Sequence, residues 1–316
     1  MTDRQPMTVI TAAEVFAAGF PALVEALRRG HRGPMPEVGR SLLERGGASF
    51  LVLPAWLPGA AFGVKMVTIL PGNEARTGNP SIQAAYQLFD GATGTPSATV
   101  DGTALTYAKT AADSALGASI LARDDAAVLL MVGAGALAPH LVAAHRSVRP
   151  SLARVLVWNR TGARAEALAG DLLEDGVDAQ AMPDLEAAVR AADVVCCATA
   201  SAEPLVRGGW LAPGTHLDLV GGFTPAMREC DDEAVRRATV FVDTRRFTID
   251  DCGDLSQPIA AGVIEPSDIA ADLFELCRGD HPGRRTRDEI TLFKNAGGGH
   301  LDLFVAMALA ERARAG

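Results

Sequence analysis

Short apolar runs alternate with helical patterns along the second half of the chain, from about Val128 onward. The stretches between the runs are rich in Ala and Leu, as expected for helices. Strands that alternate with helices are typical of βαβ units that build a parallel sheet. The pattern therefore predicts a doubly wound α/β domain, with strands at 127–132, 153–158, 193–198, 215–220 and 239–243 and helices at 136–147, 162–175 and 184–191.

The first half of the chain has a different pattern. It predicts a helix at 11–29, extended segments at 48–54 and 62–70, turns rich in Gly and Pro through 71–102, and a long helix at 103–122. Such a mixture is typical of an α+β lobe built on a mixed or antiparallel sheet.

The tail of the chain, 297–314, is helical again because its apolar residues repeat at helical spacing. A chain of 316 residues exceeds what one simple hydrophobic core holds, about 250–300 residues. We therefore expect two lobes, one formed by 1–120 with 297–316 and the other by 121–296, with a cleft between them.

Composition and charge exclude several classes of function. The net charge of −9 has the wrong sign for a nucleic-acid partner. No apolar run approaches the roughly 18–20 residues of a membrane helix, and the first residues do not resemble a secretory signal, so we expect a cytoplasmic protein. The five cysteines form neither a disulfide framework nor a metal-ligand spacing, so we expect reduced thiols and no metal.

A glycine-containing turn provides the strongest chemical signal. Gly133, Ala134, Gly135, Ala136 and Leu137 follow a predicted strand and open a predicted helix. In a dinucleotide-binding turn the first glycine allows the tight bend and the second lets the backbone approach the pyrophosphate, which faces the helix N-terminus. The alternative is a tight turn without a ligand, but the strand before it and the helix after it favour a nucleotide site of the Rossmann type.

The next strand distinguishes between the two nicotinamide cofactors. An NAD site usually has an acidic residue at this strand end, whereas an Arg nearby accommodates the extra phosphate of NADP. Here the strand leads into Asn159, Arg160 and Thr161, without an acid. The sequence therefore favours NADPH, with NADH or NAD as the alternative if Arg160 is only a solvated loop residue.

Two lysines are candidates for binding an anionic substrate. Lys65 has apolar neighbours on both alternating faces of its strand, so it is either buried beside an anion or an edge lysine that reaches solvent. Lys109 shares a helix face with Leu105, Ala112 and Leu116, and the alternative is an exposed pair with Asp113.

Six segments occur in a characteristic order: Gly63-Val64-Lys65, Phe89 to Pro96, Asp101 to Thr106, Lys109 to Ala112, Gly133-Ala134-Gly135 and Phe293 to Gly297. Together they resemble the ornithine cyclodeaminase/mu-crystallin family, over about residues 36 to 310. The resemblance implies a Rossmann lobe and a substrate-binding and dimerisation lobe that the C-terminal helix completes. It also implies a pyridine nucleotide, a small amino or imino acid substrate and a homodimer.

The family's site residues can be placed on this chain. Its active-site Lys corresponds to Lys65, its carboxylate-binding Arg to Arg40, and the Arg that opens its Arg-Thr-Ala-Ala motif to Lys109, which lacks the bidentate fork of a guanidinium. Asp302 is expected to border the cofactor or the C-terminal hinge, or to serve only as a helix N-terminal charge. For the cofactor we expect contacts from the glycine turn, from 159–161, and from Ala198, Thr199, Val220, Gly221 and Lys294.

One departure from the family narrows the chemistry. Cyclodeaminases and the related alanine dehydrogenases have an Asp after the Gly pair at the fifth strand, and here Gly221-Gly222 is followed by Phe223. An aromatic ring cannot act as an acid or a base. Asp218 lies just upstream, where it is either a structural carboxylate or a second acid in the cleft.

These features predict a ketimine reductase, which delivers a hydride from NADPH to a cyclic imine carboxylate. The expected substrate is Δ1-pyrroline-2-carboxylate or Δ1-piperideine-2-carboxylate, and the product is proline or pipecolate. Arg40, Lys65 and Lys109 would bind the carboxylate and orient the imine, Phe223 would exclude water, and Thr224 would line the nicotinamide pocket. The alternatives are an ornithine cyclodeaminase with bound NAD, a dehydrogenase that forms alanine or an N-alkyl amino acid, and a crystallin-like NADPH-binding protein without turnover.

Overall fold

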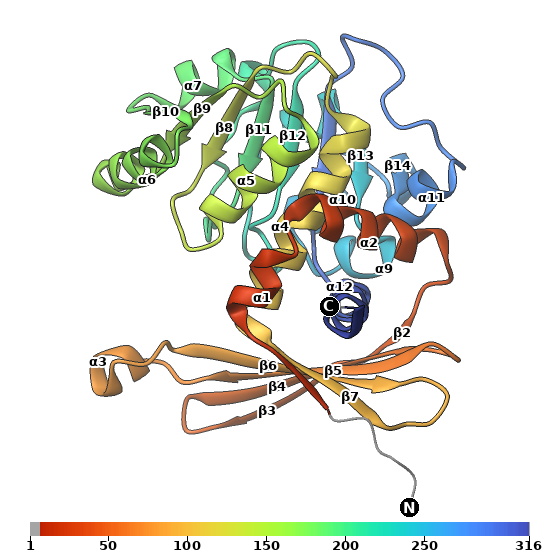
Figure 1. Ribbon diagram of the computed structural model, residues 1–316. Coiled ribbons are helices and arrows are strands. Elements are labelled where there is room, and N and C mark those ends of the chain that lie inside the picture. The colour runs from red at the N-terminus through yellow and green to blue at the C-terminus, as the bar shows by residue number, and fades with distance from the viewer. Residues whose placement is uncertain (1–6, 316) are drawn as a thin grey trace, which may run out of the picture. The chain divides into compact units, whose positions relative to one another are not determined.

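The computed structural model describes residues 7–315, and the chain divides into two compact units (Figure 1). Unit 1 contains the residues up to Lys109 together with those from Gly298 onward, and unit 2 is Thr110–Gly297. The division falls inside helix α4 (Gly102–Leu121), which contributes to both units.

A mixed sheet forms the base of unit 1. Its strand order is β1-β7-β6-β5-β4-β2, with β3 paired to β4, and all these pairs are antiparallel except β1 with β7. The predicted α+β lobe on a mixed sheet is confirmed. The strands are β1 (Thr8–Ile10), β2 (Glu37–Val38), β3 (Ser41–Arg45), β4 (Ala48–Leu57), β5 (Ala61–Ile69), β6 (Ile82–Asp90) and β7 (Pro96–Asp101).

The prediction of turns throughout 71–102 was wrong, because this segment contains β6 and β7 as well as the short helix α3 (Asn73–Thr77). The two strands form a hairpin whose turn is fixed by Asp90. One Asp90 carboxylate oxygen accepts hydrogen bonds from the backbone N–H groups of Ala92 and Thr93 and from the Thr93 hydroxyl. Gly and Pro residues in and around this turn indicate turn structure, and for that reason the strands on either side of it were not predicted.

The predicted single helix at 11–29 is in fact two helices, α1 (Ala12–Ala17) and α2 (Phe20–Arg32). A capping box formed by Thr11 and Glu14 starts α1. Gly19 then adopts φ 76°, a left-handed conformation that breaks the helix and that glycine adopts at low cost.

Helix α12 (Gly299–Ala315) packs on one face of the sheet and against α2 (Figure 1). The contact with α2 is close, because a Cβ added at Gly30 would lie 2.4 Å from the Phe304 ring. The residues at the start of α12, including His300 and Asp302, are buried. The last helix therefore completes the core of unit 1.

Unit 2 is a doubly wound parallel sheet with the strand order β10-β9-β8-β11-β12-β15-β13-β14. The first five strands of this order form the Rossmann arrangement, so the predicted fold class is confirmed. The strands are β8 (Val128–Val132), β9 (Arg154–Trp158), β10 (Asp178–Ala181), β11 (Val194–Cys197), β12 (His216–Leu219), β13 (Thr239–Val242), β14 (Ile269–Asp272) and β15 (Thr291–Lys294).

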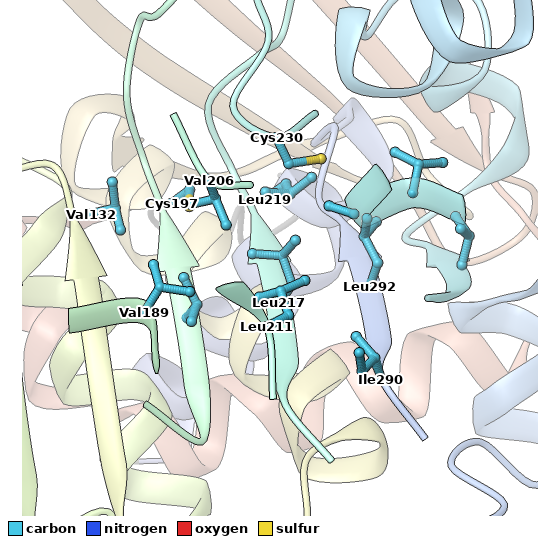
Figure 2. Close-up of a cluster of buried hydrophobic side chains, with 14 of the residues drawn as sticks. Val132, Val189, Cys197, Val206, Leu211, Leu217, Leu219, Cys230, Ile290 and Leu292 are labelled. Carbon is cyan, nitrogen blue, oxygen red and sulfur yellow. The ribbon is translucent and has the colours of Figure 1, made fainter. Parts of the chain in front are cut away.

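The helices of unit 2 are α5 (Ala138–Val148), α6 (Gly162–Glu174), α7 (Leu185–Ala191), α8 (Asp232–Arg237), α9 (Arg245–Thr248), α10 (Gly253–Ala260) and α11 (Leu273–Arg278). Figure 2 shows the buried core on one side of the sheet, a single cluster that includes Val132, Leu217 and Leu292 from three strands and Val189 of α7. Within residues 7–315, no helix combines the length and the hydropathy that a membrane span requires.

Candidate functional site

A pocket of about 490 Å³ lies in unit 2 at the carboxyl ends of the central strands. Ligands of open α/β sheets bind at this edge, where the strand order reverses between β8 and β11. The pocket is lined by Gly133, Ala134, Gly135, Ala136, Leu137, Trp158, Asn159, Arg160, Arg164, Ala198, Thr199, Ala200, Ser201, Leu205, Val220, Gly221 and Phe223. Twelve of these lining residues were expected from the sequence.

The glycine turn has the geometry of a phosphate-binding loop. Gly133 adopts φ 108°, and a Cβ there would lie 2.6 Å from the carbonyl oxygen of Ala198. A Cβ at Gly135, in contrast, would meet no protein atom within 4 Å. No contact within the protein therefore requires glycine at position 135. A pyrophosphate would require it, because the absence of a Cβ lets the phosphates approach the backbone.

The end of the pocket near β9 is basic. Arg160 and Arg164 both line it, and neither is buried. The Asn159 side chain accepts a hydrogen bond from the backbone N–H of Ala134 and donates one to the carbonyl of Thr161, so it joins the two loops. Thr161 itself does not line the pocket. Two guanidinium groups at this end suit the extra phosphate of NADP.

The other end of the pocket is formed by the loops after β11 and β12. Thr199, Val220 and Gly221 line it, and Phe223 borders it with 59% of its surface exposed. Thr224 is half-buried and lies outside the lining; its carbonyl accepts hydrogen bonds from Met227 and Gly253.

Lys294, which we expected to contact the cofactor, lies beneath this end of the pocket and does not line it. Its Nζ donates hydrogen bonds to the carbonyl of Gly221, 2.6 Å away, and to the carboxylate of Asp254, 3.0 Å away. Lys294 therefore supports the pocket wall through the carbonyl of Gly221 and does not itself line the pocket.

Lys65 is buried on the face of β5 that α12 covers. Its Nζ lies 2.8 Å from a carboxylate oxygen of Asp302, which is on the first turn of α12. Lys65 is therefore a buried lysine paired with an anion, and not an edge lysine that reaches solvent. Asp302 is thus more than a helix-terminal charge, because it fixes the ammonium group of Lys65.

Tyr86 lies directly opposite Lys65 on β6, in the space that Gly63 leaves free. A Cβ at Gly63 would lie 1.9 Å from the Tyr86 hydroxyl. Burial, followed by the charge of Asp302, raises the pKa of Tyr86 well above its ordinary value, so the phenol stays protonated.

Lys109 is buried at the end of unit 1, and its charge acts on His300 of α12. Burial, with the charges of His31 and Lys109, lowers the pKa of His300 well below its ordinary value, so this imidazole is neutral. Lys65 and Lys109 are therefore both associated with the first turns of α12. Arg40 is exposed, in the connection between β2 and β3.

Asp218 is fully buried in the middle of β12 and is held by hydrogen bonds from Ser114, His145 and Cys196. Although burial alone would raise its pKa, the His145 hydrogen bond holds the pKa of Asp218 below the ordinary value. His145, Cys196 and Asp218 are near enough to share a metal ion. The Nε2 atom of His145 and the Cys196 thiol already form hydrogen bonds with Asp218, whereas Nδ1 of His145 has no hydrogen-bond partner among the described residues. Asp218 has the contacts of a structural carboxylate.

Sequence reasoning missed Trp158, Arg164, Ala200, Ser201 and Leu205 in the pocket, and Tyr86 beside Lys65. Arg164 was recoverable, because it lies on the first turn of α6 directly after the 159–161 loop. Tyr86 was not, because its position depends on the pairing of β6 with β5.

Comparison with known proteins places these features in a family. The model of the ornithine cyclodeaminase/mu-crystallin family matches residues 6–316. The chain is 44% identical over 292 residues to Delta(1)-pyrroline-2-carboxylate reductase of Paracoccus denitrificans strain Pd 1222, covering 91% of each chain.

Two solved structures share the fold across nearly the whole chain. Delta(1)-pyrroline-2-carboxylate reductase of Thermococcus litoralis, in complex with NADH and L-proline, is 30% identical with a TM-score of 0.89 and 98% coverage of both chains. An archaeal alanine dehydrogenase dimer with bound NAD is 28% identical with a TM-score of 0.88, covering 98% of this chain and 96% of that one. The chain therefore belongs to the ornithine cyclodeaminase/mu-crystallin family.

Proposed function

We propose that this protein is an NADPH-dependent ketimine reductase, which reduces Δ1-pyrroline-2-carboxylate or Δ1-piperideine-2-carboxylate to proline or pipecolate. The observation that carries the proposal is Phe223 at the edge of the nucleotide pocket, where the family's cyclodeaminases and alanine dehydrogenases have an acid. Without that acid, the reaction that requires the fewest catalytic groups is hydride addition to an existing carbon–nitrogen double bond. The similarity to two proteins named as pyrroline-2-carboxylate reductases supports this choice.

The residues of unit 1 hold the substrate in this proposal. Lys65, oriented by Asp302, binds the substrate carboxylate, and Lys109 and Arg40 add positive charge. Because Lys65 is buried beside its counter-ion, its ammonium group is fixed before substrate arrives, which lowers the entropic cost of orientation. A bound nicotinamide supplies the hydride, and Phe223 shields the reacting carbon from water.

NADPH is the proposed cofactor because Arg160 and Arg164 lie at the end of the pocket where the adenosine ribose of a dinucleotide is held. The glycine turn, Asn159, Ala198, Thr199, Val220 and Gly221 would contact the rest of the cofactor. Thr161 supports the loop from outside the pocket lining.

A homodimer is proposed from the sheet of unit 1. Helix α12 covers one face, and the opposite face carries apolar side chains in register, including Trp56 stacked on Phe62 with ring centroids 5.4 Å apart. Val9 and Leu43 are each 63% exposed, and Phe50 is 37% exposed. An apolar sheet face of this kind is typical of a protein–protein interface, and the archaeal alanine dehydrogenase of the same fold is a dimer.

The test is NADPH oxidation, followed by absorbance, with each cyclic imine in turn. Parallel reactions contain NADH in place of NADPH, ornithine with NAD, and pyruvate with ammonia or methylamine. The proposal predicts rapid oxidation of NADPH by at least one imine and little reaction in the other mixtures. Ammonia release from ornithine, or turnover that requires an added amine, would contradict it and support a cyclodeaminase or an amino acid dehydrogenase.

A further inference from the structure

Three fully buried ionisable side chains form a cluster beneath the pocket of unit 2. Lys294 comes from the end of β15, Asp254 from α10, and Glu229 from the segment before α8. One Asp254 carboxylate oxygen accepts the Lys294 hydrogen bond, and the other accepts a hydrogen bond of 2.7 Å from the backbone N–H of Glu229. The cluster joins three segments that are distant in the sequence.

The cluster contacts the backbone that lines the pocket. One Glu229 carboxylate oxygen accepts hydrogen bonds from the Thr199 N–H at 2.7 Å and from the Thr199 hydroxyl at 2.8 Å. Lys294 binds the carbonyl of Gly221. Both Thr199 and Gly221 line the pocket, so the cluster determines where this part of the pocket wall lies.

Two consecutive glycines let the carboxylates approach this closely. A Cβ at Gly221 would lie 2.3 Å from a Glu229 carboxylate oxygen, and one at Gly222 would lie 2.2 Å from a carboxylate oxygen of Asp254. Gly222 also adopts φ 50°. No side chain would fit at position 221 or 222, so the Glu229 and Asp254 carboxylates pack directly against the backbone of the pocket wall.

The charge of the cluster depends on Glu229. The second Glu229 carboxylate oxygen is buried without a hydrogen-bond partner in the described part of the chain. Burial raises the pKa of Glu229 to about 7; the Lys294 charge opposes this rise and the Asp254 charge reinforces it. The neighbouring thiols of Cys196, Cys197 and Cys230 have strongly raised pKa values, so they remain neutral.

The nicotinamide half of a dinucleotide binds at this end of a Rossmann pocket, beyond the strands that follow the change of strand order. The oxidised nicotinamide ring is cationic and the reduced ring is neutral. We propose that Glu229 is a positioning residue that holds Thr199 against the nicotinamide and, when ionised, favours the oxidised cofactor over the reduced one. This inference rests on the proposed function only in requiring that the pocket binds a nicotinamide cofactor.

The charge of the cluster bears on hydride transfer. If a bound reduced ring gave its hydride to the carbon of a protonated imine, the ring would gain the positive charge that the iminium nitrogen loses. With Glu229 ionised, the two carboxylates and one ammonium of the cluster carry a net negative charge, which stabilises the cationic ring. With Glu229 protonated, the cluster is neutral and this stabilisation is absent.

The test is equilibrium binding of NADP⁺ and NADPH without any imine, by calorimetry or nicotinamide fluorescence, from about pH 6 to about pH 8.5. The ratio of the two dissociation constants is informative, because titration of the adenosine phosphate affects both cofactors alike. In the wild-type protein, we expect NADP⁺ binding to strengthen relative to NADPH as the pH rises through 7, by about fourfold for one screened charge at about 10 Å.

Glu229→Gln removes the charge while keeping the size and an oxygen that can accept the Thr199 hydrogen bonds. We expect this variant to hold the low-pH ratio at every pH. Asp218→Asn is the matched control, a buried carboxylate of the same sheet whose partners are Ser114, His145 and Cys196, and it should keep the wild-type pH dependence while unfolding more easily.

A wild-type ratio that does not change with pH would overturn the inference even if E229Q fails to fold, and so would an unchanged pH dependence in E229Q. The proposed function fails separately. If both cofactors bind with the expected pH dependence but no imine is reduced, the reductase assignment is wrong and the role of Glu229 stands.

Discussion

Lys65 illustrates how far a single residue can be interpreted from the sequence. The apolar residues on both sides of it along the strand leave two alternatives, a buried ammonium group that requires an anion or an edge lysine that reaches solvent. The structure has the first, and the anion is Asp302, on the last helix of the chain, 2.8 Å from Nζ. No spacing rule connects residues this far apart, so the sequence could neither choose between the alternatives nor identify the anion.

The role of Lys65 is tested with two variants. Lys65→Met should lower kcat/KM for the imine by about 100-fold or more while the NADPH dissociation constant stays unchanged, because the proposed substrate-binding lysine belongs to unit 1 and the candidate nucleotide pocket to unit 2. K65M should also lose about 3–5 kcal/mol of unfolding free energy, since Asp302 is left as an unpaired buried charge.

The double variant Lys65→Met with Asp302→Asn separates these two effects. Removing both charges should restore most of the unfolding free energy, measured by denaturant titration, but not the activity. Recovery of imine reduction in the double variant would show that Lys65 contributes only to stability, which contradicts the proposed role.

Arg160 and Arg164 should determine the choice of cofactor. Replacing both with Ala should raise the KM for NADPH about 10- to 100-fold, the loss expected for hydrogen bonds to a charged phosphate, and leave the KM for NADH nearly unchanged. Arg154→Ala, an exposed arginine on β9 that binds Gln180 outside the pocket, is the control. An equal rise for both cofactors would mean that the two arginines do not recognise the phosphate.

At the scale of elements, helices with strong periodicity and strands with long apolar runs were predictable. The five strands predicted in unit 2 correspond to β8, β9, β11, β12 and β13 within one or two residues at each end. The strands β10, β14 and β15 were missed because β10 and β14 consist mostly of Ala and polar or charged residues and β15 follows the charged segment 284–289. Strands with so weak an apolar pattern depend on their neighbours in the sheet.

The close contact between α2 and α12 can be tested with two helical glycines. Gly30→Ala should destabilise the protein by about 1–3 kcal/mol, because the new methyl group would collide with the Phe304 ring. Gly170→Ala in α6 should instead stabilise it by about 0.5–1 kcal/mol, because its Cβ meets open space and alanine favours helix. Both values come from denaturant unfolding, and a stabilising G30A would contradict the packing described for unit 1.

At the scale of the whole molecule, the site depends on chain segments that return from far along the sequence. Helix α12 comes back to the sheet of unit 1 and brings Asp302 to Lys65. Strand β15 inserts between β12 and β13, which places Lys294 beneath Gly221. The motifs identified both lysines as candidates, but only the topology shows that one pairs with an acid and the other supports the pocket wall.

The apolar sheet face of unit 1 should hold two copies of the chain together. Trp56→Lys places a charge on this face and should shift the protein from dimer to monomer in analytical ultracentrifugation. Leu173→Lys is the control, because Leu173 is also an exposed apolar residue, on α6 of unit 2. A wild-type monomer, or a W56K variant that remains a dimer, would exclude this face as the interface.

The central claim is that this protein transfers a hydride from NADPH to the carbon of an imine. The most direct measurement uses NADPH deuterated at C4 of the nicotinamide, with Δ1-pyrroline-2-carboxylate as substrate and mass spectrometry of the product. We predict proline that carries one deuterium at its α-carbon (C2), the former imine carbon, from one of the two C4 stereoisomers only. Proline without deuterium from both stereoisomers, or no proline from either, would contradict the claim.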